Sequence, residues 1–370
     1  MGVSSAFPQS NAIPTPVPGL GLAEISPEQF AAAQTEMTRT WFQNLLKSGK
    51  NVEAHIAGRR TAYLMRWKEA GRYIGPSARI LDIGGGYLYE DLLTYFRSMN
   101  WDYWYTDVGE QETAHARGLG QSFGFDPQHF STALNHELDY DDGLFDAVFS
   151  SHCVEHSMNL KQTLRQLNRI LRPGGDLVVS IPFGWEPNPN HPYFLLENEW
   201  LALIEDAGFR VRAYQIGSEY PESGHDLMIA AQKVCPVADR FRIEPDDFTK
   251  SRYALHSFRD TSIRYDGPRI EKDDHIILEG GGWSAEITLA AGVREVLPVF
   301  FRHTWSGIVR VESGEDAVYG DLYRPHSVIQ PLRLRLSAPS EAGRRVKISP
   351  VGKNEASFDF QAVIAGYMTR

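Results

Sequence analysis

The chain has 370 residues, of which 42% are hydrophobic and 23% are charged; this composition is typical of a folded globular protein and excludes a disordered or collagen-like chain. Its formal net charge of −10 comes without any basic block, and such a surface repels phosphate backbones, which argues against nucleic acid as a partner. Because single cores stop growing at roughly 250–300 residues, the length predicts two domains.

Cysteine usage and the amino-terminal residues predict a cytoplasmic protein without a membrane partner. Cys153 and Cys235 are far apart in the sequence, so we expect no disulfide framework and a reducing compartment. Residues 1–21 lack the basic start and apolar core of a signal peptide. No apolar run approaches the ~20 residues that span a bilayer.

Helices are predicted before the first strand. Residues 1–25 are rich in proline and are predicted to be disordered. The run Ser26-Pro27-Glu28-Gln29 has the residue types of a helix start. A second helix is expected over Val52 to Tyr73, ended by Gly75-Pro76. Residues 26–75 therefore form a predicted helical segment.

From Ala78 to Val234, apolar strands alternate with helical segments, which predicts a parallel α/β sheet. The short connection 218–224 predicts a hairpin, so the sheet is expected to end in an antiparallel pair. The predicted strands are Arg79–Ile83, Tyr103–Thr106, Ala147–Ser150, Leu177–Ile181, Val211–Ile216 and Asp226–Gln232. The predicted helices are Tyr89–Ser98, Leu160–Leu171 and Trp200–Ala207.

The composition changes after Cys235. Residues 236–265 are charged without clear periodicity and are predicted to be a linker. Residues 266–370 show period-two alternation, as in Leu332–Leu336, with glycines between the predicted strands. This pattern predicts a separate antiparallel β domain, most simply a β-sandwich.

The strand Arg79–Ile83 leads into Gly84, Gly85 and Gly86. Glycine permits a tight turn and lets a ligand lie against bare peptide groups, which suits a nucleotide-like cofactor at the carboxyl edge of a parallel sheet. A dinucleotide fingerprint would have another glycine where Tyr89 stands. The pattern thus favours S-adenosylmethionine over a dinucleotide.

Asp107 closes the second predicted strand. A carboxylate at this position can accept hydrogen bonds from both ribose hydroxyls, each contributing roughly 1.5–3 kcal/mol. An alternative is that the three glycines form only a structural turn and that Asp107 caps a helix.

Four segments, in this order, resemble the class I S-adenosylmethionine-dependent methyltransferases over about residues 76–234, within a predicted domain of residues 76–235. They are Ile80–Gly86, Asp107, Leu144–His152 and Leu171–Val179. The resemblance implies a Rossmann-like seven-stranded sheet, S-adenosylmethionine as the cofactor and a lid formed by helical residues 26–75. It also implies that Gly84 and Gly86 pack against the methionine and ribose parts, while Asp107 holds the ribose.

Further cofactor contacts are expected from the same resemblance. Asp82 is expected near the ammonium group of the cofactor, directly or through water, and Ser150 lies at the end of the matching fourth strand. The acidic residue that often binds the adenine amino group in this family has no clear counterpart, and Asn135 is the candidate in its place. Arg59 could approach the cofactor carboxylate or an anionic substrate, the alternative being an exposed, solvated arginine.

His152, Glu155 and His156 follow the fourth strand, where the transferred methyl group is expected. A hydroxyl acceptor benefits from a base, and neutral imidazole suits this role near pH 7. The spacing of the two histidines predicts one shared helical face, and Glu155 could orient a histidine or bind substrate. Alternatively, His156 packs under the sheet. No further Cys or His cluster completes a zinc site, so no metal is predicted.

The loop after the fifth strand offers a second group of candidates. Trp185 and Tyr193 could line an acceptor pocket, and His191 is an alternative base. The competing interpretation is an ordinary surface loop.

The predicted β domain is rich in aromatic residues, which suit sugar rings but also pack in any β core. They are Trp283, Phe300, Phe301, His303, Trp305, Tyr319 and Tyr323. A surface for homo-oligomer formation is a third possibility. The sequence therefore predicts O-methylation of a sugar or glycan-precursor hydroxyl. The alternatives are N- or carboxyl-methylation of a small metabolite, or a non-catalytic binding protein that acts through its β domain.

Overall fold

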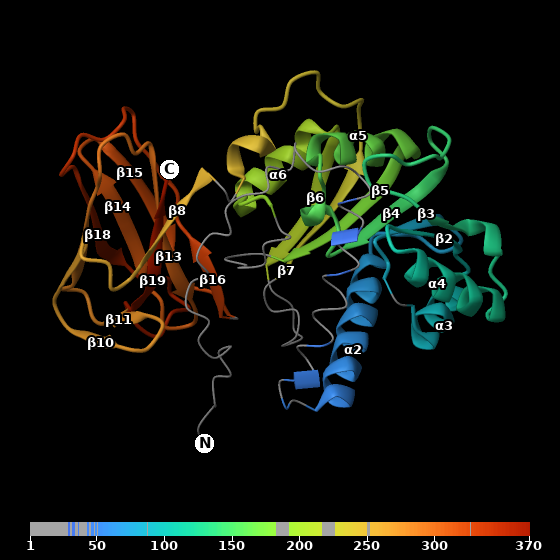
Figure 1. Ribbon diagram of the computed structural model, residues 1–370, viewed down its shortest axis with the longest axis horizontal. Coiled ribbons are helices and arrows are strands. Elements are labelled where there is room, and N and C mark those ends of the chain that lie inside the picture. Colours follow the sequence, from blue (N-terminus) through green and yellow to red (C-terminus); the bar gives the residue numbers. More distant parts are fainter. Residues whose placement is uncertain are drawn as a thin grey trace. The chain divides into compact units, whose positions relative to one another are not determined.

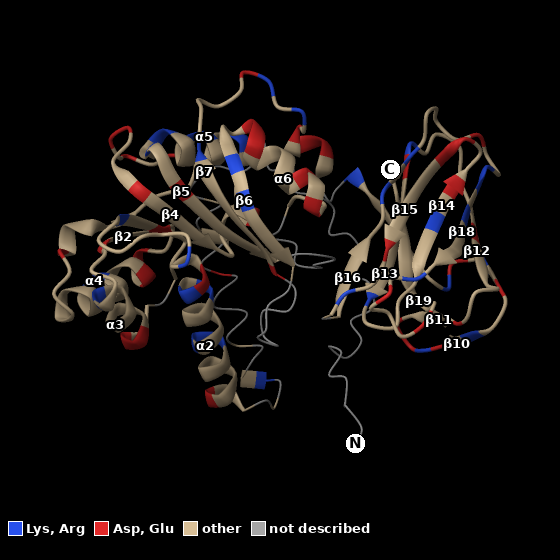
Figure 2. Cartoon of the chain, turned by 180° about the vertical axis from the view of Figure 1, so that it is seen from behind, with Lys and Arg blue, Asp and Glu red and all other residues tan. Residues whose placement is uncertain are grey.

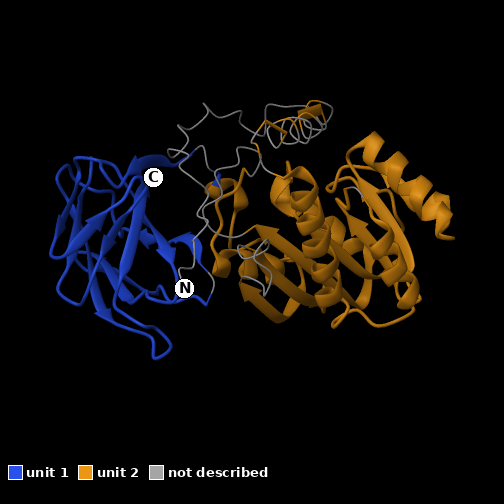
Figure 3. Cartoon of the chain, turned by 90° about the horizontal axis from the view of Figure 1, so that it is seen from below, with its two compact units in different colours: residues 1–19, 183–189, 249–370 blue, residues 20–182, 190–248 orange. Residues whose placement is uncertain are grey.

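A computed structural model describes residues 51–86, 88–182, 192–216, 226–249, 252–325 and 327–370, together with isolated positions between residues 29 and 49. The predicted disorder of residues 1–25 and most of the first predicted helix lie outside these described residues. The described residues divide into two compact units, one within residues 20–248 and one containing residues 252–370 (Figure 3).

The first unit contains a seven-stranded sheet with the order β3-β2-β1-β4-β5-β7-β6. Strands β1 to β5 are parallel, while β7 is antiparallel to both β5 and β6. The strands are β1 (Arg79–Ile83), β2 (Asp102–Asp107), β3 (Phe130–Thr132), β4 (Phe145–Ser151), β5 (Leu171–Pro182), β6 (Phe209–Ile216) and β7 (Asp226–Lys233). This arrangement confirms the predicted Rossmann-like sheet and its final antiparallel pair.

Helices cover both faces of this sheet (Figure 1). Helices α2 (Val52–Ala70), α3 (Glu90–Ser98) and α4 (Glu110–Ser122) lie on one face. Helices α5 (Leu160–Ile170) and α6 (Glu197–Asp206) lie on the other.

The core under α2 is aromatic. Trp67 is fully buried, with its ring centroid 4.0 Å from that of Phe149 on β4 and 4.6 Å from that of Phe96 on α3. Burying rings of this size contributes strongly to stability, so Trp67 anchors α2 on the sheet. This contact fixes the part of α2 that carries Tyr63 and Arg66, which reach the carboxyl edge of the sheet.

The second unit consists of two antiparallel sheets, with orders β10-β11-β19-β13-β16 and β15-β14-β18-β12-β9. Strand β8 also pairs with β19, and β17 with β13. The strands are β8 (Ala254–Ser257), β9 (Ile263–Asp266), β10 (Arg269–Glu271), β11 (Ile276–Leu278), β12 (Ser284–Thr288), β13 (Glu295–Arg302), β14 (Ile308–Ser313), β15 (Asp316–Asp321), β16 (Val328–Pro331), β17 (Leu334–Arg335), β18 (Arg345–Gly352) and β19 (Ala362–Thr369). Residues of both sheets share one core, including Phe300, Ile348 and Trp283. The predicted β-sandwich is confirmed.

The predicted linker, residues 236–265, differs from the structure. It contains the 3-10 helix η5 (Pro245–Phe248), and it also contains β8 and the start of β9, which pair with β19 and β12. Strand β9 ends its sheet, and most residues of β8 and β9 are partly or fully exposed. Edge strands tolerate charged residues. These strands therefore lack the alternation of apolar and polar residues from which a strand is predicted.

Figure 2 shows acidic and basic residues interspersed along the described helices and strands of both units. The formal net charge of −10 is therefore spread along the chain rather than collected in one segment.

Candidate active site

The carboxyl ends of β1, β2 and β4 meet at one edge of the sheet. The strand order reverses between β1 and β4, and ligands of open α/β sheets bind outside the carboxyl ends of the strands at such a point. The amide of Gly84 donates to the carbonyl of Thr106 at 2.8 Å, which joins the loop after β1 to the end of β2.

Backbone conformation and packing constrain the three glycines of this loop in different ways. Gly84 and Gly86 have φ values of 71° and 55°, which a side chain rarely adopts. A Cβ on Gly84 would collide with Cys153, and one on Gly85 with the ring of Tyr105, whereas one on Gly86 would meet nothing within 4 Å. Packing therefore requires the first two glycines, while Gly86 borders open space.

Asp107 lies directly against this loop. Its Oδ2 accepts a hydrogen bond from the amide of Gly86 at 3.0 Å, and its Oδ1 accepts one from the amide of Gly109 at 2.9 Å. Burial raises the pKa of Asp107 above its usual value, although these two amides act in the opposite direction. The structure thus brings together the two predicted cofactor residues Gly86 and Asp107.

Asp82 is fully buried at the end of β1. Its Oδ2 accepts hydrogen bonds from the hydroxyls of Tyr103, at 2.8 Å, and Tyr63, at 3.2 Å. Burial raises the pKa of Asp82 to about 7. The carboxyl group connects α2 to the sheet, a role that the sequence did not predict, while its role toward a cofactor ammonium stays a prediction.

Asn135 is held by the segment that precedes α5 and by α5 itself. Its Nδ2 donates to Ser157 Oγ at 2.9 Å, and its Oδ1 accepts from Thr163 Oγ1 at 3.1 Å. Ser150, near the end of β4, is fully buried, and its hydroxyl makes no hydrogen bond of ordinary geometry among the described residues, although the Cys153 thiol lies close to it. Buried hydroxyls are usually paired, so Ser150 offers a polar group at the edge where a ligand is expected.

His152 adopts a left-handed backbone conformation, with φ 54°. Its amide donates to the carbonyl of Ser180 at 2.8 Å, and its Nε2 lies 2.9 Å from Oδ1 of Asp226, the first residue of β7. The prediction that His152 and His156 share a helical face is wrong. The helical turn here is the 3-10 turn η3 (Val154–His156), and it begins after Cys153. His152 lies before this turn in a left-handed conformation, which a right-handed helix cannot contain.

Glu155 and His156 lie away from the solvent. The side chain of Glu155 is 5% exposed and its Oε1 lies 3.8 Å from His156 Nε2. A substrate contact by Glu155, a base role for His156 and the packing of His156 under the sheet all stay predictions; the His156 side chain is 15% exposed.

Two polar side chains of α2 reach this edge of the sheet, Tyr63 at Asp82 and Arg66 at Asp226. Arg59, Tyr63 and Arg66 are four and three residues apart, a spacing that places them on one side of a helix. Arg66 Nε lies 2.6 Å from Asp226 Oδ2. Arg59 is exposed, which agrees with the alternative of a solvated arginine, and its approach to the cofactor carboxylate stays a prediction. Tyr63, Arg66 and Asp226 were not predicted as site residues; for the two on α2, their helical spacing from Arg59 was the available signal.

The candidates in the loop after β5 are only partly described. Trp185 and His191 lie outside the described residues. Tyr193 is buried; its hydroxyl donates to the carbonyl of Met158 at 3.2 Å and accepts from the amide of Leu160 at 3.4 Å. Burial raises its pKa to about 12. Its hydroxyl is therefore engaged in holding the start of α5, and its contact with an acceptor stays a prediction.

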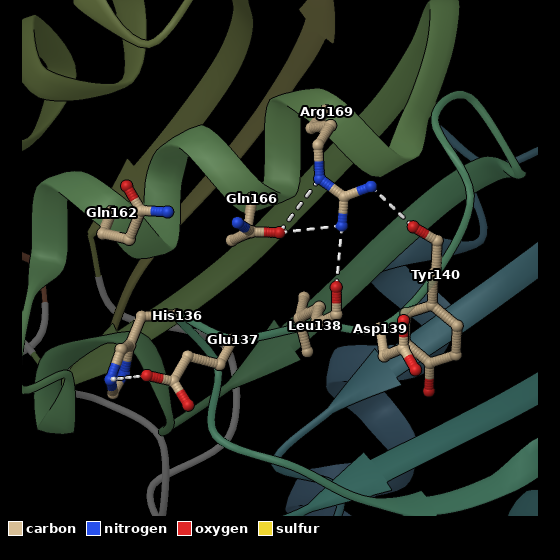
Figure 4. A pocket seen from close by; sticks show the side chains of 8 residues that line it. All are labelled: His136, Glu137, Leu138, Asp139, Tyr140, Gln162, Gln166 and Arg169. Atoms are coloured by element: carbon tan, nitrogen blue, oxygen red, sulfur yellow. Dashed lines mark hydrogen bonds and ion pairs between the residues drawn. The ribbon is translucent and has the colours of Figure 1, made fainter. Parts of the chain in front are cut away.

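A hollow of about 470 Å³ lies elsewhere on this unit, between residues 136–140 and α5 (Figure 4). Arg169 crosses it and donates to the carbonyls of Leu138 and Tyr140 and to the side chain of Gln166. None of the predicted site residues lines this hollow. It lies where the segment 136–140 packs against α5.

Comparison with known proteins agrees with this geometry. Residues 81–179 match the model of a family described as a methyltransferase domain. Over these residues the chain therefore carries a methyltransferase domain. The matched segment runs from the end of β1 to β5 and includes the glycine loop, Asp107 and His152.

Two curated relatives of the methyltransferase domain differ widely in size. A sarcosine/dimethylglycine N-methyltransferase of Halorhodospira halochloris is 29% identical over 135 residues, covering 34% of this chain and 44% of the relative. A highly reducing polyketide synthase of Pyricularia oryzae is 24% identical over 227 residues, covering 52% of this chain and 8% of the relative. The chain thus spans less than half the length of either.

Among solved structures, a 1,6-didemethyltoxoflavin N1-methyltransferase of Burkholderia thailandensis is 23% identical. The match covers 57% of this chain and 92% of that chain, with a TM-score of 0.41.

No helix among the described residues is both long and apolar enough to cross a membrane. The same residues hold no group of three or more His, Cys, Asp or Glu side chains placed to bind a metal ion.

Proposed function

We propose that this chain is an S-adenosylmethionine-dependent methyltransferase whose acceptor is a hydroxyl group. The observation that carries the proposal is the pairing of Gly86 with Asp107 at the switch point of the sheet. A glycine that borders open space lies against a carboxylate at the carboxyl edge, which is the arrangement that a ribose-bearing cofactor requires.

The residues at this edge fit the cofactor. Gly86 leaves room that a Cβ would fill, and Asp107 would accept bonds from the ribose. Ser150 supplies a buried hydroxyl that makes no hydrogen bond of ordinary geometry among the described residues, and Arg59 on α2 would hold the carboxylate end. When bound, S-adenosylmethionine supplies a methyl group on a positively charged sulfur, which keeps the C–S electron pair as the methyl leaves.

The protein's part in this reaction is positioning and proton removal. Holding an acceptor in line can contribute up to ~7–11 kcal/mol toward lowering the barrier. His152, at the end of β4, would accept the proton of the acceptor hydroxyl, a step worth roughly 10²–10⁴-fold in rate. A base at this position is of most use to an acceptor that must lose a proton, which favours a hydroxyl.

The finer part of the proposal is that the hydroxyl belongs to a sugar or glycan precursor. Two large aromatic side chains of the β-sandwich support it. Trp305 is 50% exposed, Phe358 is 66% exposed, and their ring centroids lie 5.3 Å apart. Neither ring is used in the core, and exposed aromatic faces suit the apolar side of a sugar ring.

An amine acceptor is the second candidate, because the Halorhodospira relative is named as an N-methyltransferase. A neutral amine carries its own lone pair and needs no strong base, so the two candidates differ in their dependence on His152.

Methyl transfer from labelled S-adenosylmethionine tests the proposal. The acceptors are sugars and sugar nucleotides, small amines and small carboxylic acids. We expect transfer to the first group, and its loss in Gly86→Ala, where a methyl group fills the space next to Asp107. Gly280→Ala is the matched control, because Gly280 also has a positive φ, 71°, and nothing within 4 Å of a Cβ, but lies in the β-sandwich. Transfer only to amines would replace the hydroxyl proposal, and equal loss in both variants would contradict the assigned site.

A further inference from the structure

Asp226, Arg66 and His152 form a connected group drawn from three distant parts of the chain. Asp226 opens β7, Arg66 lies on α2 and His152 follows β4. The Asp226 side chain is 8% exposed, and its two oxygens are divided between its neighbours. Oδ1 lies 2.9 Å from His152 Nε2, and Oδ2 lies 2.6 Å from Arg66 Nε.

Asp226 is held in its charged form. Ser180 Oγ also donates to Oδ2, at 3.3 Å, so donors reach this oxygen from both α2 and β5. Burial alone would raise the pKa of Asp226, but its pairing with His152 and Arg66 outweighs burial and lowers that pKa below the usual value. An ionised carboxylate only accepts hydrogen bonds.

It follows that Nε2 of His152 carries the hydrogen. In a neutral imidazole the other nitrogen, Nδ1, is then the free acceptor. The side chain of His152 is 34% exposed, so a molecule at the carboxyl edge can reach it. The charged groups around the ring are Asp226 on β7 and Arg66 on α2, with Glu155 and His156 next on its own segment.

The backbone also holds His152 in place. A left-handed conformation is strained for a non-glycine residue, and the hydrogen bond from the His152 amide to the carbonyl of Ser180 keeps His152 in it. Strained residues of this kind cluster at functional sites, where the surrounding structure determines their geometry.

We propose that Asp226 and Arg66 are positioning residues that fix His152 as a base with Nδ1 facing the acceptor. This inference rests on the proposed function. The acceptor hydroxyl would give its proton to Nδ1 while its oxygen bonds to the methyl carbon; the bond between that carbon and the cofactor sulfur would break, and its electron pair would stay on sulfur. The resulting imidazolium is stabilised by Asp226 and returns its proton to water. Arg66 keeps the second oxygen of Asp226 occupied, so the carboxylate does not turn away from the ring.

Asp226→Asn gives a sharp test. In the variant, the donors Arg66 and Ser180 face the position of Oδ2, so the amide oxygen takes that position and the amide nitrogen faces His152. Nε2 must then accept a hydrogen bond, and the hydrogen moves to Nδ1. The lone pair that removes the proton is lost although the shape of the site is retained, and we expect turnover to fall by roughly 10²–10⁴-fold.

The tautomer can be read directly, without any acceptor. Proton–nitrogen NMR spectra of histidine-labelled protein at about pH 9, where histidines are ordinarily neutral, distinguish the two forms, and a His152→Gln sample assigns the signal. We expect hydrogen on Nε2 in the wild type and on Nδ1 in Asp226→Asn. In Arg66→Met/Asp226→Asn, which frees the amide to rotate, we expect a mixture.

Asp176→Asn is the matched control, since Asp176 pairs with Arg212 at 2.7 Å, on a different part of the same sheet. It should change neither tautomer nor turnover. A wild type with hydrogen on Nδ1, or a tautomer that Asp226→Asn leaves unchanged, would overturn the inference, and the wild-type spectrum alone decides this even if the variant does not fold. Failure of the wild type to bind S-adenosylhomocysteine would instead defeat the proposed function.

Discussion

Asp82 lies at the end of β1 with none of its surface exposed, and the hydroxyls of Tyr103 and Tyr63 are its hydrogen-bond donors among the described residues. Two phenols do not replace the hydration of a carboxylate, which is why burial raises the pKa of Asp82 to about 7. The free energy of unfolding therefore includes a penalty for charging this group. The penalty is absent below the unfolded pKa near 4, grows as the pH rises, and is complete above about 7.

Asp82→Asn should remove this pH dependence, because the amide accepts a hydrogen bond without ionising. We expect the variant's free energy of unfolding, relative to the wild type, to rise by about 2–4 kcal/mol between pH 4 and pH 8. Urea unfolding at several pH values measures it. Asp139→Asn, at an exposed loop position, is the control and should show no such trend. If the difference in free energy of unfolding between Asp82→Asn and the wild type does not change with pH, the explanation is wrong.

At the scale of elements, α2 links the ends of two strands. Its Tyr63 reaches β1 through Asp82, and its Arg66 reaches β7 through Asp226. Strands β1 and β7 are separated in the sheet by β4 and β5. Helix α2 therefore spans the edge where the cofactor is expected. It corresponds to the second helix of the predicted lid, residues 26–75, and a lid must cover this edge.

The strands and helices with clear apolar patterns were predictable from the sequence, and those without were not. Helix α4 buries Thr113, Ala116 and Gly120, so it shows no apolar stripe; Gly120 is needed because a Cβ there would collide with the ring of Phe130. Strand β3 has only three residues, too few for a pattern to form.

The candidate site shows the same division. Gly86 and Asp107 belong to local motifs and could be predicted. The group formed by His152, Asp226 and Arg66 could not, because its members are joined only by the pairing of β5 with β7 and by the packing of α2. A single sequence carries no local signal for such contacts.

At the scale of the whole molecule, each unit has its own core, so each should unfold separately. Trp67 in the methyltransferase domain and Trp283 in the β-sandwich are both almost fully buried. Removing either ring should cost roughly 3–5 kcal/mol. S-adenosylhomocysteine should raise the unfolding temperature of the domain that binds it.

Scanning calorimetry of Trp67→Ala and Trp283→Ala tests this prediction. Trp67→Ala should lower the transition that S-adenosylhomocysteine raises, and Trp283→Ala should lower the other. A single transition that both substitutions shift equally would mean that the two units unfold together.

The central claim is that the glycine loop and Asp107 bind the adenosyl group of the cofactor, and calorimetric titration with S-adenosylhomocysteine tests it most directly. We expect the wild type to bind and Asp107→Asn to bind roughly ten- to a hundredfold more weakly, since one charged acceptor is lost. Asp102→Asn, at the opposite end of β2, should bind as the wild type does. No binding by the wild type, or equal affinity in Asp107→Asn, would contradict the account.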